Sequence, residues 1–169
     1  MRGPRRYIRQ AEKNGFSYRY TRSLEDYEYY YFEMYLPFVK TRHGEQAQIA
    51  QMADQYTRWF KPGGLILITQ HDQPVAGALV IRTGKMCHGS EMGILHCAPE
   101  LLEAGVPAFI MWSTILWSHK QKAEQLNLGT SNAWYADGSF DSKTKWGAHV
   151  VRRKYIAAQW SYLYNHLPD

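Results

Sequence analysis

Hydrophobic and polar residues alternate with two different periods along the chain, and the changes of period predict its helices and strands. Residues 5–13 follow a helical period that ends at Asn14-Gly15, and residues 16–21 alternate apolar with polar as a half-buried strand does. Ser23, followed by acidic residues, predicts the start of a second helix. One broad aromatic stripe runs along that helix, formed by Tyr27, Tyr31, Met34, Tyr35 and Phe38.

We expect this stripe to lie mostly in the core, although an exposed part of it would suit an acyl or amine pocket. Pro37 should kink the helix, because proline has no backbone N–H and its ring clashes with the preceding turn. A third helix is predicted over residues 45–60, where Pro62-Gly63-Gly64 stops the pattern.

Three strands are predicted in the middle of the chain, over residues 65–69, 75–82 and 86–95. Short turns join them, so we expect an antiparallel meander at the centre of one mixed sheet. The third strand contains Gly89, Gly93 and the charged Glu91. Two glycines weaken a strand, which indicates either a bulge or a close approach of another group to its backbone.

The last third of the chain predicts a crossover unit. After a loop over residues 96–106, a largely buried helix begins at Pro107 and presents Phe109, Trp112 and Leu116 to the core. A short strand follows at residues 126–128, then a Gly-Thr-Ser-Asn loop and a second short helix from residue 137 to 147. Sheets of this kind bind ligands in the loops at the carboxyl ends of their strands. Residues 148–164 predict one long strand or a hairpin.

Composition fits one folded domain. The chain has 169 residues, of which 45% are hydrophobic, enough for a sizeable core. No apolar run approaches the roughly 20 residues that span a bilayer, and the basic N-terminus lacks the apolar segment of a secretion signal. Cys87 and Cys97 have no metal-ligand spacing, so we expect free buried thiols rather than a disulfide, and a cytoplasmic protein.

Positive charge is concentrated in two places. The net charge is +5, with one basic cluster in residues 1–15 and another at Arg152-Arg153-Lys154. Such clusters can attract the phosphates of a cofactor or of RNA, and they also occur on ordinary solvated surfaces.

Four short motifs resemble the FemAB-like branch of the GNAT acyltransferases, including the acetyltransferase domains associated with cellulose biosynthesis. They are Arg6-x-x-Arg9-x-Ala11-x-x-x-Gly15, the Pro-Val-Ala-Gly-Ala-Leu strand at 74–79, Leu-Asn-Leu-Gly at 126–129, and the run from Gly138 to Ala148. The resemblance implies an α/β (α+β) GNAT-like fold, a mixed and largely antiparallel sheet with helices on both faces. Residues 1–169 would form a single domain, or the equivalent of the C-terminal half of a two-domain FemAB-type protein.

The resemblance also implies an activity: transfer of an acyl group, most simply acetyl, from acyl-CoA to a small-molecule or peptide amine that attacks it directly. Glu91 would be the general base, Lys143 would stabilise charge, and Tyr135 would belong to the catalytic site. Gly93, Gly105, Ala108 and Asn132 would contact the cofactor, and no metal is implied. Structural alternatives are a Glu91 carboxylate paired with Arg82 or Lys85, and a solvent-facing Lys143.

The expected cofactor loop departs from the usual Gln/Arg-x-x-Gly-x-Gly/Ala pattern, because Leu102 and Pro107 occupy two of its positions. This departure keeps two alternatives open, an aminoacyl-tRNA-dependent transferase of the FemAB type and a catalytically silent GNAT-like binding module. The acceptor and the oligomeric state do not follow from the sequence.

Overall fold

The structure is a computed structural model that describes residues 4–46, 49–129 and 138–150. The chain divides into two compact units, residues 1–132 and residues 133–169, which we describe separately.

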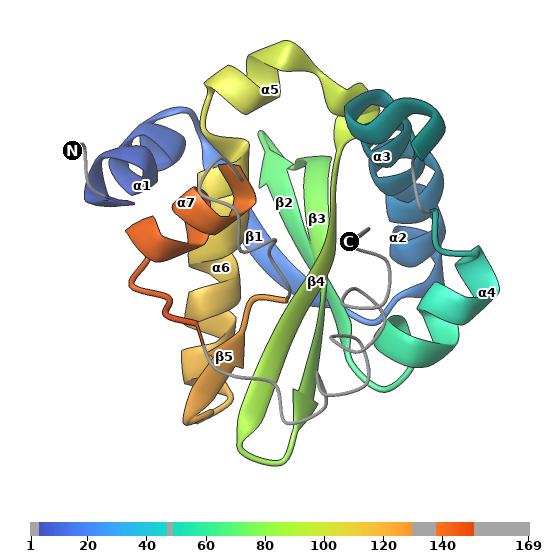
Figure 1. The fold of residues 1–169 in the computed structure, drawn as a ribbon. Coiled ribbons are helices and arrows are strands. Elements are labelled where there is room, and N and C mark those ends of the chain that lie inside the picture. The colour runs from blue at the N-terminus through green and yellow to red at the C-terminus, as the bar shows by residue number, and fades with distance from the viewer. Residues whose placement is uncertain (1–3, 47–48, 130–137, 151–169) are drawn as a thin grey trace, which may run out of the picture. The chain divides into compact units, whose positions relative to one another are not determined.

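A five-stranded sheet forms the centre of the first unit (Figure 1). Its strands are β1 (Phe16–Thr21), β2 (Gly64–Gln70), β3 (Gln73–Thr83), β4 (Met86–Ile94) and β5 (Gln125–Asn127), and they lie side by side in sequence order. All neighbours are antiparallel except β4 and β5, which are parallel. The predicted central meander is therefore confirmed.

Helices cover both faces of this sheet, as predicted (Figure 1). One face carries α1 (Pro4–Lys13), α5 (Pro99–Glu103) and α6 (Val106–Lys120). The other carries a long irregular helix, made of α2 (Leu24–Tyr29), a π-helical segment η1 (Tyr30–Tyr35) and α3 (Leu36–His43). Shorter segments follow it: the 3₁₀ turn η2 (Gly44–Gln46), α4 (Met52–Gln55) and a second π-helical segment η3 (Tyr56–Phe60).

Strand β2 explains why the fold has two cores. Residues Gly64–Thr69 are all buried, so both sides of the strand need apolar partners. Ile66 and Ile68 face the core under α1 and α6, whereas Leu65 and Leu67 face the aromatic core under η1 and η3. The alternation of side chains across a strand thus divides one apolar run between two layers.

The aromatic stripe is confirmed as core: Tyr27, Tyr31, Met34, Tyr35 and Phe38 are all buried. Its helix begins at Ser23 as predicted, where the side-chain hydroxyl accepts a hydrogen bond from the Asp26 N–H. The predicted kink at Pro37 takes a different form, since the helix instead widens into the π-helical segment η1 just before this residue. Pro37 has no N–H for the preceding turn, which is consistent with a change of hydrogen-bond pattern there.

The helix predicted over residues 45–60 is wrong in its first half, because regular α-helix begins only at Met52. The reason lies in contacts with the aromatic stripe. The Ala50 N–H donates to the Tyr35 hydroxyl, and the Ala50 carbonyl accepts from the Tyr31 hydroxyl. Tyrosine side chains therefore take the backbone groups that a helix would use.

The loop predicted over residues 96–106 also contains more structure than expected. It holds a 3₁₀ turn at Leu95–Cys97 and the short helix α5, which starts with Pro99 in its first turn. Proline is favoured at that place because the first N–H groups of a helix have no internal partner. Cys97 in this loop and Cys87 on β4 are buried free thiols.

Helix α6 buries a face slightly different from the predicted one. Phe109 is buried as expected, but Trp112 and Leu116 are only half-buried. The fully buried positions continue instead through Ser113, Thr114, Trp117 and Ser118. Thr114 on this face packs so close to β4 that a Cβ at Gly89 would lie 2.9 Å from the Thr114 Cγ2 atom.

In the second unit, the described residues form α7 (Gly138–Lys145), close to the predicted range. An ion pair between Lys145 and Asp141 joins adjacent turns on its surface, with a distance of 2.5 Å between Nζ and Oδ2. The predicted strand over residues 148–164 lies mostly outside the described residues, as do Asn132, Tyr135 and Arg152–Lys154.

We predict that Phe109→Ala lowers the free energy of unfolding by about 3–5 kcal/mol, because a buried aromatic ring would leave a cavity in the core. Trp112→Ala is the matched control on the same helix, and its half-buried ring should give a clearly smaller loss. Denaturant unfolding of both variants measures the difference. Equal losses would show that the two rings are equally important to the core.

Candidate active site

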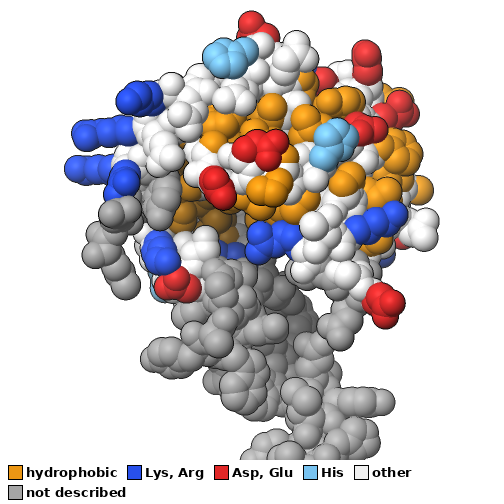
Figure 2. Space-filling view, turned by 90° about the horizontal axis from the view of Figure 1, so that it is seen from above, with side chains coloured by type: hydrophobic (Ala, Val, Ile, Leu, Met, Phe, Trp, Pro, Cys, Tyr) orange, Lys and Arg blue, Asp and Glu red, His pale blue; other side chains and the backbone are white. Residues whose placement is uncertain are grey.

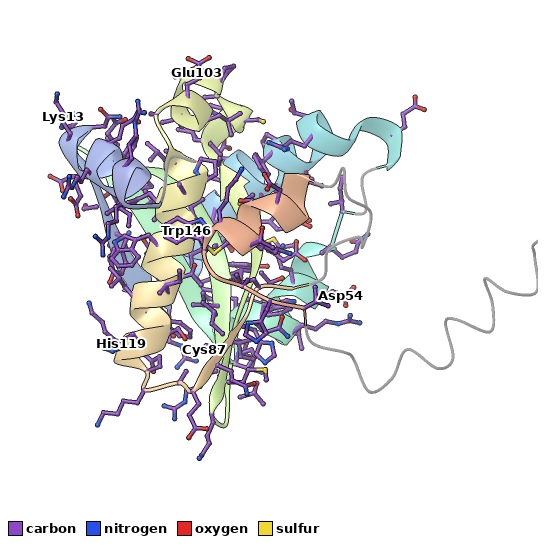
Figure 3. The ribbon with its side chains drawn as sticks, turned by 60° about the vertical axis from the view of Figure 1, so that its left-hand side comes forward. Lys13, Asp54, Cys87, Glu103, His119 and Trp146 are labelled. Carbon is purple, nitrogen blue, oxygen red and sulfur yellow. The ribbon has the colours of Figure 1, made fainter. Side chains whose placement is uncertain are left out.

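Strands β4 and β5 separate after a short paired segment. Only Met86, Cys87 and His88 of β4 pair with β5. Figure 3 shows Cys87 near this paired end and Glu103 of α5 at the opposite end of the unit. Between them, the edge of β4 from Gly89 to Ile94 that faces β5 has no strand partner among the described residues. Unpaired backbone groups on such an edge can bind a ligand by hydrogen bonds.

The open part of β4 contains a bulge at Glu91. Leu79 of β3 is opposite Ser90, and Ala78 is opposite Met92, so Glu91 is an extra residue in the strand. Its φ angle of +48° is left-handed, an uncommon conformation for a residue other than glycine. The glycines of this strand predicted either a bulge or a close approach to its backbone; a bulge is present, and its extra residue is the proposed general base.

Segment η1 holds the bulge from one side. The buried Tyr30 hydroxyl donates a hydrogen bond to the main-chain carbonyl of Glu91. Glycines make this approach possible: a Cβ at Gly93 would lie 2.5 Å from the Tyr35 backbone nitrogen, and a Cβ at Gly77 would lie 2.9 Å from Tyr30 Cδ2. No larger residue fits at Gly93 unless the helix backbone moves, so helix packing alone already explains this glycine.

The Glu91 side chain is half-buried and is not paired with the predicted cations. Lys85 instead forms an ion pair with Glu124, and Arg82 donates to the Gly84 carbonyl. The Glu91 carboxylate is close enough to Tyr35 to affect its ionisation. Burial, and then the nearby Glu91 charge, raises the pKa of Tyr35 to about 12, so the phenol stays neutral beside the carboxylate.

The start of α6 offers few backbone donors. Gly105 precedes the helix with a φ angle of +91°, and Pro107 stands in the first turn without an N–H. The Phe109 N–H is used by the Gly105 carbonyl. Val106 and Ala108 are left as the first-turn residues whose N–H groups have no partner within the helix. Glu103 is exposed and points outward from α5 in Figure 3.

The end of the first unit that carries α5 is partly apolar. Figure 2 shows hydrophobic side chains across the middle of this face, with acidic and histidine side chains among them and basic side chains mainly towards its left and lower parts. Met92, next to the bulge, exposes 39% of its surface. This face could therefore contact an apolar as well as a polar ligand.

The predicted site residues lie on separate elements of the structure. Glu91 and Gly93 lie on the open part of β4, and Gly105 and Ala108 flank the first turn of α6. Lys143 lies on α7 in the second unit, where it is half-buried, and Tyr135 and Asn132 lie outside the described residues. Sequence reasoning did not identify Tyr30 as part of the site. Gly77, a glycine inside a strand, is a sequence signal for a close approach to the backbone, and its pairing with Gly93 places two such glycines side by side.

Among the described residues, no group of histidine, cysteine or acidic side chains could hold a metal ion. The same part of the chain contains no helix with the length and apolar character needed to cross a membrane.

No known protein-family profile and no curated protein matches this chain. Its similarity to solved structures is clear but distant. The ribosomal-protein-S18-alanine N-acetyltransferase of Escherichia coli matches with a TM-score of 0.55 and 13% identity, over 83% of each chain. The structure of AAC(6')-Iy, solved in complex with the bisubstrate analogue CoA-S-monomethyl-acetylneamine, matches with a TM-score of 0.50 and 8% identity, over 82% of this chain and 97% of that chain.

A third match is a C-terminal domain (DUF2156) attributed to a lysylphosphatidylglycerol synthetase of Agrobacterium fabrum. Its TM-score is 0.58 and its identity 13%, and the match covers 76% of this chain but only 40% of that one. At these identities the likeness concerns the fold. The mixed sheet, the helices on both faces and the diverging β4 and β5 agree with it: the chain has the fold of the GNAT acetyltransferases.

Proposed function

We propose that this protein is an N-acyltransferase that moves an acyl group, most simply acetyl, from acyl-CoA to an amine. The observation that carries the proposal is the open, bulged edge of β4 within a GNAT fold. A thioester lying along such an edge can direct its carbonyl oxygen at backbone N–H groups, which stabilise the negative charge that develops on the oxygen.

The acyl donor is proposed to lie between β4 and the start of α6. The N–H groups of Val106 and Ala108 are suited to the pyrophosphate of CoA, since a helix N-terminus favours negative charge. Gly105 leaves room before the helix, while Gly93 and Asn132 complete the proposed cofactor contacts. The CoA analogue bound by AAC(6')-Iy supports this choice of donor. Pro107 removes one N–H, so we expect weaker pyrophosphate binding than at a turn with all its donors.

In the proposed reaction, the amine nitrogen attacks the acyl carbon and forms a C–N bond. The C–S bond then breaks, and the sulfur leaves as CoA thiolate. Glu91 accepts the proton that the amine loses, directly or through water, and the thiolate takes up a proton to complete the balance. Lys143 is proposed to stabilise negative charge during the transfer, with Tyr135 as a further residue of the site.

The acceptor is proposed to be a small-molecule or peptide amine, in the cytoplasm. Apolar side chains on the face shown in Figure 2 suit an acceptor or acyl group with an apolar part.

A second candidate is transfer of an aminoacyl group from aminoacyl-tRNA, as in FemAB-type enzymes. Two observations favour it: the donor missing at Pro107, and the likeness to a domain attributed to an enzyme that by its name makes a lysyl lipid. The Arg152-Arg153-Lys154 cluster would then bind RNA phosphates. A silent GNAT-like binding module is the third reading, and it predicts ligand binding without turnover.

Calorimetry and thermal-shift measurements with acetyl-CoA, longer acyl-CoAs and aminoacyl-tRNA can distinguish between the two proposed classes of donor. We expect acetyl-CoA to stabilise the protein by about 2.7 kcal/mol at a hundred times its dissociation constant. Neutralising Arg152-Arg153-Lys154 should leave this binding nearly unchanged. The second candidate would be favoured by two results together. The parent would bind tRNA but no acyl-CoA, and the neutralised variant would lose tRNA binding strongly and in a salt-dependent way.

Glu91→Gln should lower turnover roughly 100-fold or more, because the amide cannot accept the proton. Glu124→Gln is the control, since it removes an exposed carboxylate that is paired with Lys85. Full activity of Glu91→Gln would assign the base to another group.

Lys143→Ala should lower turnover while changing the melting temperature little, because its proposed role concerns charge in the transition state. Lys145→Ala is the matched control on α7, where the lysine pairs with Asp141 on the surface. Equal turnover in the two variants would remove Lys143 from the mechanism.

A further inference from the structure

The bulge in β4 creates a backbone group that the sheet itself does not pair. Glu91 is the extra residue of the bulge, so it has no residue opposite it on β3. A backbone carbonyl that is withdrawn from water is costly without a hydrogen bond. The partner here is a side chain from another layer, the hydroxyl of Tyr30.

Tyr30 is held firmly enough to act as a fixed donor. It is fully buried among Tyr27 and Tyr35, and its ring lies against the place where Gly77 lacks a Cβ. Burial, and then the nearby charge of Glu91, raises the pKa of Tyr30 well above its ordinary value. The hydroxyl therefore remains protonated and able to donate at neutral pH.

The orientation of one peptide plane follows from this bond. A peptide is planar and trans, so fixing the direction of the Glu91 carbonyl also fixes the direction of the Met92 N–H on the opposite side of the same plane. One hydroxyl group of η1 therefore helps to set the orientation of the Glu91–Met92 peptide in the bulge.

We propose that Tyr30 is a positioning residue, which holds the Glu91 bulge in the shape that lets the open edge of β4 recognise the acyl carbonyl of the donor. This inference rests on the proposed function, because it names the device that shapes the same site. Tyr30 does not touch the reacting atoms and acts through the main chain of Glu91.

The test compares the binding of two probes, acetyl-CoA and its S-ethyl thioether analogue, which lacks the carbonyl oxygen. We expect the parent protein to prefer acetyl-CoA about tenfold, roughly the effect of one good hydrogen bond. Tyr30→Phe should reduce this preference to less than about twofold, while binding of the S-ethyl analogue stays close to that of the parent. Calorimetry on the full chain measures both affinities.

Tyr27→Phe is the matched control. Tyr27 is equally buried, and its hydroxyl donates to the Met52 carbonyl over 2.9 Å, away from the bulge. Both variants lose one buried tyrosine–carbonyl hydrogen bond, so a merely structural role predicts the same result for each. We expect only Tyr30→Phe to lose the preference for acetyl-CoA.

A second variant covers the case in which Tyr30→Phe does not fold. Gly77→Ala keeps the hydroxyl but places a methyl group against the Tyr30 ring, and it should cause the same loss of preference together with changed amide chemical shifts at Glu91 and Met92. A preference for acetyl-CoA that survives in the Tyr30 or Gly77 variant would overturn the inference and leave the proposed function intact. A parent protein that binds neither probe would overturn the proposed donor, and the inference with it.

Discussion

The structure depends on how closely one irregular helical segment lies against the sheet. Segment η1 approaches β3 and β4 so near that Gly77 and Gly93 have no space for a side chain. This contact joins the aromatic core to the open strand and brings a tyrosine hydroxyl to the bulge. Core packing and the shape of the candidate site therefore depend on the same contact, because η1 both fills the aromatic core and holds the bulge of β4.

The contact between this helix and irregular backbone segments explains why so many of the helix's buried residues are tyrosines. Each of its buried tyrosines combines a large apolar ring with one hydroxyl, and the hydroxyls reach main-chain groups at Met52, Ala50 and Glu91. Phenylalanine would fill the same volume but leave those carbonyls unpaired. Tyrosine thus fastens irregular segments to the core at places where regular secondary structure is interrupted.

Periodicity predicted the sheet well because its strands interact with sequence neighbours through short turns. The continuous apolar run of β2 is typical of a strand buried on both faces, and the glycines of β4 are typical of a bulged or closely approached strand. Ser23, as an N-cap residue, predicted where the aromatic helix begins. Contacts between residues distant in sequence could not be predicted from periodicity. Nothing near Ala50 shows that Tyr31 and Tyr35 will take its backbone groups, and nothing near Glu91 names Tyr30 as its partner. Of the proposed site residues, Glu91 and Gly93 lie on the strand that the pattern predicted, and Lys143 lies on α7 of the second unit.

The short ladder between β4 and β5 has a consequence for the energetics of the open edge. Three paired residues form a small cooperative unit, and β5 is an edge strand with only this one neighbour in the described sheet. Separating it would break few hydrogen bonds and would leave the meander of β2, β3 and β4 intact. This junction can therefore open locally, which would lengthen the unpaired edge of β4, without global unfolding of the first unit.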